Sequence, residues 1–269
     1  MSKPYYSVHT AYIVDSLKQS EWQGILLHGP SGIGLAYAAR DIASSLTKQI
    51  ITIVPDEKGT ISIDIVRELY LLGRTKGGLT VFIIDDADTM SIPAQNALLK
   101  LLEEPVASLR FILTSHTPAR LLLTVRSRVA EYALTPISAA QSSMLLSDLK
   151  QTESTMQAQL LFIAGGLPSA LTMYATTPKQ FELRARSVRD ARHFLQGSKE
   201  ERLLSAARYK ERDAAIALID DMLKLLRRNV ETKLNSDGPD TIDLLLATEM
   251  ALTENASVRM SLTSLALHL

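Results

Sequence analysis

The chain has 269 residues, of which 46% are hydrophobic and 22% are charged, a composition typical of a folded globular protein rather than a disordered one. Lys plus Arg and Asp plus Glu both number 29, so the net charge is zero and no overall field draws the chain toward nucleic acid or anionic lipid. The chain has no cysteine, which excludes disulfides, thiolate metal sites and cysteine nucleophiles.

The N-terminal sequence is polar and mixed, so it does not have the apolar run of a secretory signal. No window of the chain approaches the roughly 20 apolar residues that a membrane-spanning helix needs. We therefore expect a soluble cytoplasmic protein that has no membrane partner.

Short apolar runs alternate with amphipathic stretches through the first half of the chain, which predicts strands joined by crossover helices in a parallel sheet. The runs are rich in branched residues, as expected of strands that are buried on both faces. The predicted strands are residues 24–28, 50–54, 81–84 and 110–114, with residues 131–134 as a shorter fifth strand.

A glycine loop, Gly29-Pro30-Ser31-Gly32-Ile33-Gly34, directly follows the first predicted strand. Apolar residues at helical spacing predict a helix over residues 35–46, and a strand, a glycine loop and a helix in this order are the context of a phosphate-binding loop. The working loop ends in Lys and a hydroxyl residue, but Leu35 and Ala36 stand here.

The loss of the cation and of the magnesium ligand weakens nucleotide binding by about two to four orders of magnitude, if each contact contributes roughly 1.5 to 3 kcal/mol. We therefore expect Gly29, Gly32 and Gly34 to form a degenerate loop that binds ATP and Mg²⁺ weakly at most. No cofactor and no metal site are then required. The alternative is a glycine turn with a structural role alone.

Two acids, Asp85 and Asp86, end the apolar strand predicted at residues 81–84. In a nucleotide hydrolase the first acid holds Mg²⁺ and the second orients the attacking water. The second acid is usually Glu, and Asp86 is shorter by one methylene group. This is a second departure from a working hydrolase.

Helical signals dominate the rest of the chain. Ser91 as N-cap, Pro93 in the first turn and a stop at Pro105 predict one helix. Beyond residue 135 the periodicity is helical throughout, and it is interrupted at residues 165–168, 177–178 and 235–239.

The segment Val81 to Arg128 resembles the clamp-loader subunits of bacterial DNA polymerase III, which belong to the AAA+ class. The resemblance is carried by Ala87-Asp88, by Asn96-Ala97-Leu98-Leu99-Lys100-Leu101-Leu102-Glu103-Glu104-Pro105 and by Ser127-Arg128. Residues 54–69 and the closing segment 254–269 are also similar to the family. This combination is far more specific than the glycine loop or the acidic pair alone.

The resemblance implies roles for single residues. The family's Ser-Arg-Cys motif supplies an arginine finger to the nucleotide of a neighbouring subunit, and it stands here as Ser127-Arg128-Val129. Arg128 is then the finger that acts in trans, with Arg126 as the alternative. Thr114, or Ser115, occupies the position of the first sensor. The second sensor's arginine is absent, because Pro168 stands at its position, and the family's zinc module of four cysteines is absent too.

The resemblance also implies an architecture: an α/β fold with a parallel AAA+ core in residues 1–135, a small helical lid in residues 136–178 and a helical collar for oligomerisation in residues 179–269. The implied partners are gamma/tau motor subunits, a delta subunit, and the sliding clamp and primed DNA through the complex. A subunit with a degraded loop and a retained finger has no ATPase activity of its own. The alternatives are an active gamma/tau-like ATPase with an atypical loop, and a structural scaffold of another AAA+ assembly.

Overall fold

The computed structural model describes residues 5–75, 78–103, 108–151, 153–232 and 238–269. The chain forms two compact units, of which the first ends at Thr176 and the second is Thr177–Leu269. The first unit contains the predicted core and the predicted lid as far as residue 176, and residues 177–178 of the predicted lid fall in the second unit.

A five-stranded parallel sheet forms the centre of the first unit, in the order β2-β3-β4-β1-β5. Its strands are β1 (Gly24–His28), β2 (Gln49–Ile53), β3 (Thr80–Ile84), β4 (Leu109–Ser115) and β5 (Ala130–Ala133). All five predicted strands are therefore present, within one residue at most of their predicted bounds.

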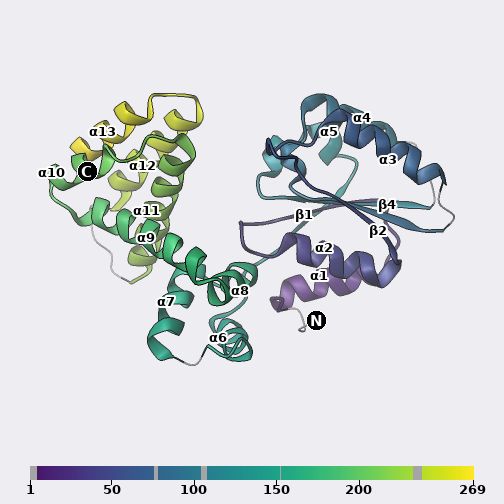
Figure 1. Cartoon of the computed structure of the whole chain (residues 1–269), viewed down its shortest axis with the longest axis horizontal. Coiled ribbons are helices and arrows are strands. Elements are labelled where there is room, and N and C mark those ends of the chain that lie inside the picture. Colours follow the sequence, from purple (N-terminus) through teal and green to yellow (C-terminus); the bar gives the residue numbers. More distant parts are fainter. Residues whose placement is uncertain (1–4, 76–77, 104–107, 152, 233–237) are drawn as a thin grey trace. The chain divides into compact units, whose positions relative to one another are not determined.

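Helices cover both faces of this sheet, as Figure 1 shows. The helices α3 (Ile63–Thr75), α4 (Ile92–Glu103) and α5 (Leu123–Arg126) lie on one face, and α1 (Val8–Gln19) and α2 (Leu35–Leu46) lie on the other. Short 3₁₀ helices, η1 (Ala87–Thr89) and η2 (Pro118–Arg120), follow β3 and β4.

The alternation of side chains along each strand divides the apolar core between the two faces. In β3, Phe82 and Ile84 pack with the helices α3 to α5, whereas Val81 and Ile83 pack with α1 and α2. Phe82 stacks on Phe111 of β4 with ring centroids 5.5 Å apart. The central strands are largely apolar, as expected of strands that are buried on both faces.

The expectation of burial on both faces, which concerns the four longer strands, is wrong for β2, and the shorter fifth strand β5 is exposed as well. Gln49 and Thr52 of β2 are exposed, and three of the four residues of β5 are exposed. These two strands form the edges of the sheet, so fewer neighbouring side chains cover them than cover β3, β4 and β1.

Local helix signals are confirmed. The helix α2 has the predicted bounds, and Ser91 caps α4, since its Oγ accepts a hydrogen bond from the Ala94 N–H at 3.3 Å. The predicted stop at Pro105 lies outside the described residues. The helices α1 and α3 are additions that the sequence patterns did not single out.

Three further helices complete the first unit: α6 (Ala139–Asp148), α7 (Ser154–Ala164) and α8 (Pro168–Thr176). Ser138 and Gln141 form a reciprocal capping box at the start of α6. The glycines before α8, Gly165 and Gly166, both have positive φ, which explains the predicted break at this point.

The second unit is helical, with α9 (Pro178–Gln196), α10 (Lys199–Ala206), α11 (Arg212–Thr232), α12 (Gly238–Thr253) and α13 (Val258–His268). Its core is centred on the apolar face of α11, where Ile219, Met222 and Leu223 are buried. Part of the break predicted at residues 235–239 lies outside the described residues. No described helix of either unit combines the length and the apolar character that a membrane span requires.

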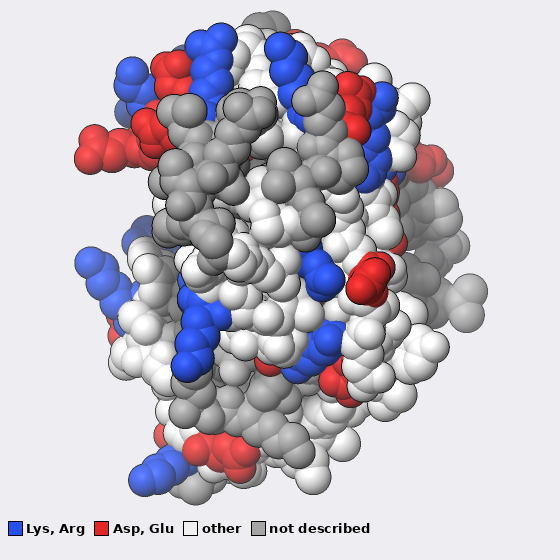
Figure 2. All heavy atoms as spheres, turned by 90° about the vertical axis from the view of Figure 1, so that its right-hand side faces the viewer, with Lys and Arg blue, Asp and Glu red and all other residues white. Residues whose placement is uncertain are grey.

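Charges of both signs are mixed on the face shown in Figure 2, where blue Lys and Arg side chains stand close to red Asp and Glu side chains. The coloured residues of this face do not gather into a surface of one sign. This agrees with the equal numbers of acidic and basic residues in the chain. Among the described residues of this face, no extended basic track is seen of the kind that binds nucleic acid by counterion release.

Candidate functional site

The candidate site lies where three neighbouring strands end. The strands β3, β4 and β1 are adjacent and parallel, so their carboxyl ends meet at one edge of the sheet. This edge carries the glycine loop, the acidic pair and the segment Thr114 to His116 at the end of β4. Ligands of parallel α/β folds bind at this kind of edge.

The glycine loop has the backbone conformation that its sequence predicts. Gly32 and Gly34 have φ values of +86° and +97°, in the left-handed region that favours glycine. Leu35, which stands in place of the loop's lysine, is only 2% exposed and packs into the apolar core beside α2. The side chain at this position therefore contributes apolar burial and carries no charge toward a phosphate.

The first turn of α8 is docked on the glycine loop. The carbonyl oxygen of Gly32 accepts hydrogen bonds from the N–H groups of Ser169 and Ala170 at 3.0 and 3.1 Å. These donors belong to the first turn of α8, where backbone N–H groups have no partner within the helix. The glycine loop therefore caps the helix, and a Cβ atom on Gly32 would lie 2.7 Å from the Cβ of Ala170.

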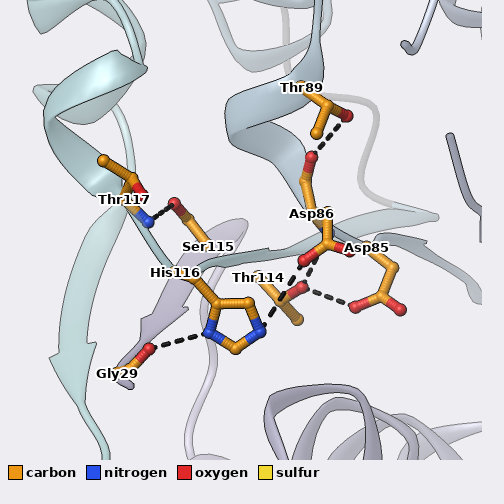
Figure 3. Close-up of polar contacts among 8 residues, drawn as sticks. All are labelled: Gly29, Asp85, Asp86, Thr89, Thr114, Ser115, His116 and Thr117. Carbon is orange, nitrogen blue, oxygen red and sulfur yellow. Dashed lines mark hydrogen bonds and ion pairs between the residues drawn. The ribbon is translucent and has the colours of Figure 1, made fainter. Parts of the chain in front are cut away.

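Thr114 binds the acidic pair from the neighbouring strand (Figure 3). Its hydroxyl donates a hydrogen bond to Asp85 Oδ1 at 2.6 Å and accepts one from the Asp86 N–H at 3.0 Å. Thr114 is fully buried, and Asp86 has a left-handed conformation with φ of +50°. The hydroxyl thus fixes the direction in which both acids leave β3.

His116 connects the acidic pair with the glycine loop, as Figure 3 shows. Its Nδ1 lies 2.8 Å from the carbonyl oxygen of Gly29, and its Nε2 lies 3.8 Å from Asp86 Oδ1. Burial, assisted by the charges of Asp85 and Asp88, raises the pKa of Asp86, while His116 acts in the opposite direction. In the sequence, His116 stands beside the sensor position without a partner pattern that suggests acid–base or metal chemistry, and its place directly after β4 is the available signal for these contacts.

The two candidate finger residues have different partners. Arg126 binds both carboxylate oxygens of Glu131, through Nε at 2.8 Å and Nη2 at 3.0 Å. This bidentate pair raises the pKa of Arg126 and lowers that of Glu131. Arg128 instead binds Glu103 Oε1 through Nη2 at 2.6 Å and the Thr124 carbonyl through Nη1 at 2.9 Å.

Arg128 does not share the edge of the sheet that carries the glycine loop. Arg128 precedes β5, which runs parallel to β1. Its carbonyl oxygen lies 3.8 Å from the point where a Cβ atom on Gly24, at the start of β1, would stand. The glycine loop follows the other end of β1. Fold geometry therefore brings together Gly29, Gly32, Gly34, Asp85, Asp86 and Thr114, and separates Arg128 from them.

The described residues contain no group of three or more His, Asp or Glu side chains that is arranged to hold a metal ion. The acidic pair on its own supplies two carboxylates, and Thr114 and His116 already engage both of its members.

The described strands and helices form a parallel α/β core, and this fold has a counterpart among solved structures. A DNA polymerase III gamma subunit-related protein of Thermotoga maritima has a similar structure, with a TM-score of 0.54 at 16% identity, over 96% of this chain and 97% of that protein. At this identity the likeness concerns the fold alone.

Sequence comparisons narrow the resemblance to particular subunits of DNA polymerase III. Residues 36–138 match the family described as "DNA polymerase III, delta subunit". The delta prime subunit of Pseudomonas aeruginosa is 31% identical over 172 residues, which are 53% of this chain and 52% of that protein. The delta prime subunit of Escherichia coli is 35% identical over a match that covers 46% of this chain and 38% of that protein. A gamma/tau subunit of Mycobacterium bovis is 27% identical over 49% of this chain and 27% of that protein. The resemblance to delta prime subunits is confirmed, and the matches span about half the length of these relatives or less.

Proposed function

We propose that the chain is a delta prime-type subunit of the DNA polymerase III clamp loader, which hydrolyses no ATP itself and supplies Arg128 to the nucleotide of a neighbouring subunit. Its partners are then gamma/tau motor subunits and a delta subunit. The assembly loads the sliding clamp on primed DNA.

The observation that carries the proposal is the position of Arg128 at the edge of the sheet opposite the chain's own glycine loop. An arginine at this place serves a nucleotide that another subunit holds. Its guanidinium is planar and permanently charged, and it suits the charge that develops on a transferring phosphoryl group. Arg126 suits this role less well, because both carboxylate oxygens of Glu131 bind it, whereas Glu103 binds Arg128 through one oxygen.

The glycine loop supports the absence of hydrolysis in this chain. Leu35 is buried where a working loop presents lysine, and Ala36 supplies no hydroxyl for Mg²⁺. The loop retains the backbone conformation of a phosphate-binding loop and lacks the side chains that bind the terminal phosphates.

The experiment that tests the proposal is reconstitution of the chain with gamma/tau-like and delta-like subunits from the same organism. The ATP hydrolysis of the assembly, stimulated by primed DNA, is compared between the wild-type chain, Arg128→Ala and Arg126→Ala. Size-exclusion chromatography verifies that each assembly is intact.

We expect Arg128→Ala to lower kcat by about 10³-fold or more at the site it faces, since an arginine finger contributes a factor of this order. Arg126→Ala serves as the matched control and should leave kcat near the wild-type value. Equal activity of Arg128→Ala and wild type in an intact assembly would contradict the finger. A failure of the chain to co-purify with clamp-loader subunits would instead favour a scaffold of another AAA+ assembly.

A further inference from the structure

Arg128 is held on two sides by groups from different parts of the chain. Its Nη2 lies 2.6 Å from Glu103 Oε1, while its Nη1 donates to the Thr124 carbonyl at 2.9 Å and to Ser127 Oγ at 3.4 Å. Thr124 and Ser127 are close in sequence to Arg128. Glu103 is the last residue of α4 and comes from a different element.

The ion pair leaves Arg128 accessible. The side chains of Arg128 and Glu103 are 36% and 48% exposed, so the pair lies at the surface and not in the core. An exposed pair of this kind contributes little to the stability of the fold. Its main physical effect is on the conformation of the arginine, whose long side chain otherwise samples many rotamers.

We propose that Glu103 is a positioning residue for Arg128. Glu103 holds the Arg128 guanidinium in the orientation in which it can contact the nucleotide of a neighbouring subunit. This inference rests on the proposed function of Arg128 as a finger in trans. Glu103 binds one terminal nitrogen and the Thr124 carbonyl binds the other, so two fixed points set the plane of the guanidinium. Pre-orientation of this kind reduces the conformational freedom that Arg128 loses when it reaches a phosphate.

The neighbouring pair provides a matched control. Arg126 and Glu131 form an ion pair of similar exposure five residues apart, and the described partners of Arg128 do not include Glu131. Glu131→Gln therefore removes the same charge as Glu103→Gln, close to the same loop, without a change in the partner of Arg128.

The test measures kcat and KM for ATP in the reconstituted assembly with Glu103→Gln, Glu131→Gln, Arg128→Ala and the double variant Glu103→Gln/Arg128→Ala. We expect Glu103→Gln to lower kcat by about two- to fivefold with KM unchanged, a size typical of an exposed ion pair. Glu131→Gln should match the wild type. In the Arg128→Ala background, Glu103→Gln should have no further effect, because its action passes through Arg128.

Three results would overturn the inference while the finger stands: a wild-type kcat for Glu103→Gln, a raised kcat for Glu103→Gln, or a further loss in the double variant relative to Arg128→Ala. A raised kcat would mean that Glu103 sequesters the arginine. If Arg128→Ala itself keeps the full activity, the proposed function fails, and the positioning role fails with it. These outcomes distinguish a failure of the positioning role of Glu103 from a failure of the proposed finger.

Discussion

The carbonyl oxygen of Gly32 accepts a hydrogen bond from the N–H of Ala170 at 3.1 Å, which joins the centre of the glycine loop to the first turn of α8. Residue 32 is a glycine for two reasons, its φ of +86° and the position of Ala170, which leaves no space for a Cβ atom. This contact connects the parallel α/β core with the helical part of the first unit.

Gly32→Ala should detach α8 from the glycine loop. The left-handed conformation costs an alanine roughly 1–2 kcal/mol, and the contact with Ala170 adds to this cost. Gly59→Ala is the matched control, since Gly59 also has a positive φ, of +72°, but has no atom within 4 Å of its Cβ position. Amide hydrogen exchange at Ser169 and Ala170 should accelerate in Gly32→Ala alone. Equal exchange in both variants would contradict the docking of α8 on Gly32.

The isolated chain should bind ATP and Mg²⁺ weakly. The loss of the loop lysine and hydroxyl removes two charge-assisted contacts, which together lower affinity by about two to four orders of magnitude. Isothermal titration calorimetry with ATP and Mg²⁺ should show no saturation at micromolar nucleotide. Saturation at micromolar ATP accompanied by turnover would favour an active ATPase instead.

Thr114→Val should destabilise the first unit by about 1–3 kcal/mol, because the buried Thr114 hydroxyl that binds both the Asp86 N–H and Asp85 Oδ1 is lost. Thr114→Ser keeps the hydroxyl and should recover most of the loss. Urea unfolding of both variants measures the difference. Equal stability of Val and Ser at this position would contradict the structural role of the hydroxyl.

Asp86→Asn should stabilise the first unit at neutral pH. Burial and the charges of Asp85 and Asp88 raise the pKa of Asp86 in the folded state, so its contribution to stability is greatest below its unfolded pKa and is lost as pH rises through the folded value. Asparagine tolerates the left-handed conformation as aspartate does and carries no charge. The melting temperatures of Asp86→Asn and the wild type should therefore differ most at pH values above the raised pKa of Asp86, and they should converge as the pH falls. A gain in melting temperature that does not depend on pH would mean that the substitution acts through the backbone conformation and not through the charge.

Asp221→Ala should destabilise the second unit by about 3–5 kcal/mol, as expected when one partner of a buried ion pair is removed. Asp221 is only 2% exposed and binds Arg184 and the Ser187 hydroxyl. The adjacent Asp220, paired with the exposed Lys224 on the same helix, is the control, and Asp220→Ala should change stability by less than about 1 kcal/mol. Chemical unfolding monitored by circular dichroism compares the two. Similar losses for both would show that the buried network does not stabilise the helices.

Local patterns were sufficient for much of the fold. The alternation of apolar runs with amphipathic stretches predicted five parallel strands, and the glycine loop and Ser91 marked where α2 and α4 begin. The exposure of β2 and β5 could not be predicted, because it depends on the order of strands in the sheet and not on the residues of each strand.

The sequence by itself determined the residues of the site: the glycines that permit the loop, the apolar Leu35 in place of a lysine, the acidic pair after β3 and the arginines before β5. Only the tertiary structure decided which of these residues meet. The parallel order β3-β4-β1 brings His116 between Gly29 and Asp86, and it places Arg128 at the opposite edge beside Glu103. The physical reason is that spacing along the chain fixes local conformation, whereas ion pairs and hydrogen bonds between distant segments depend on how strands and helices pack.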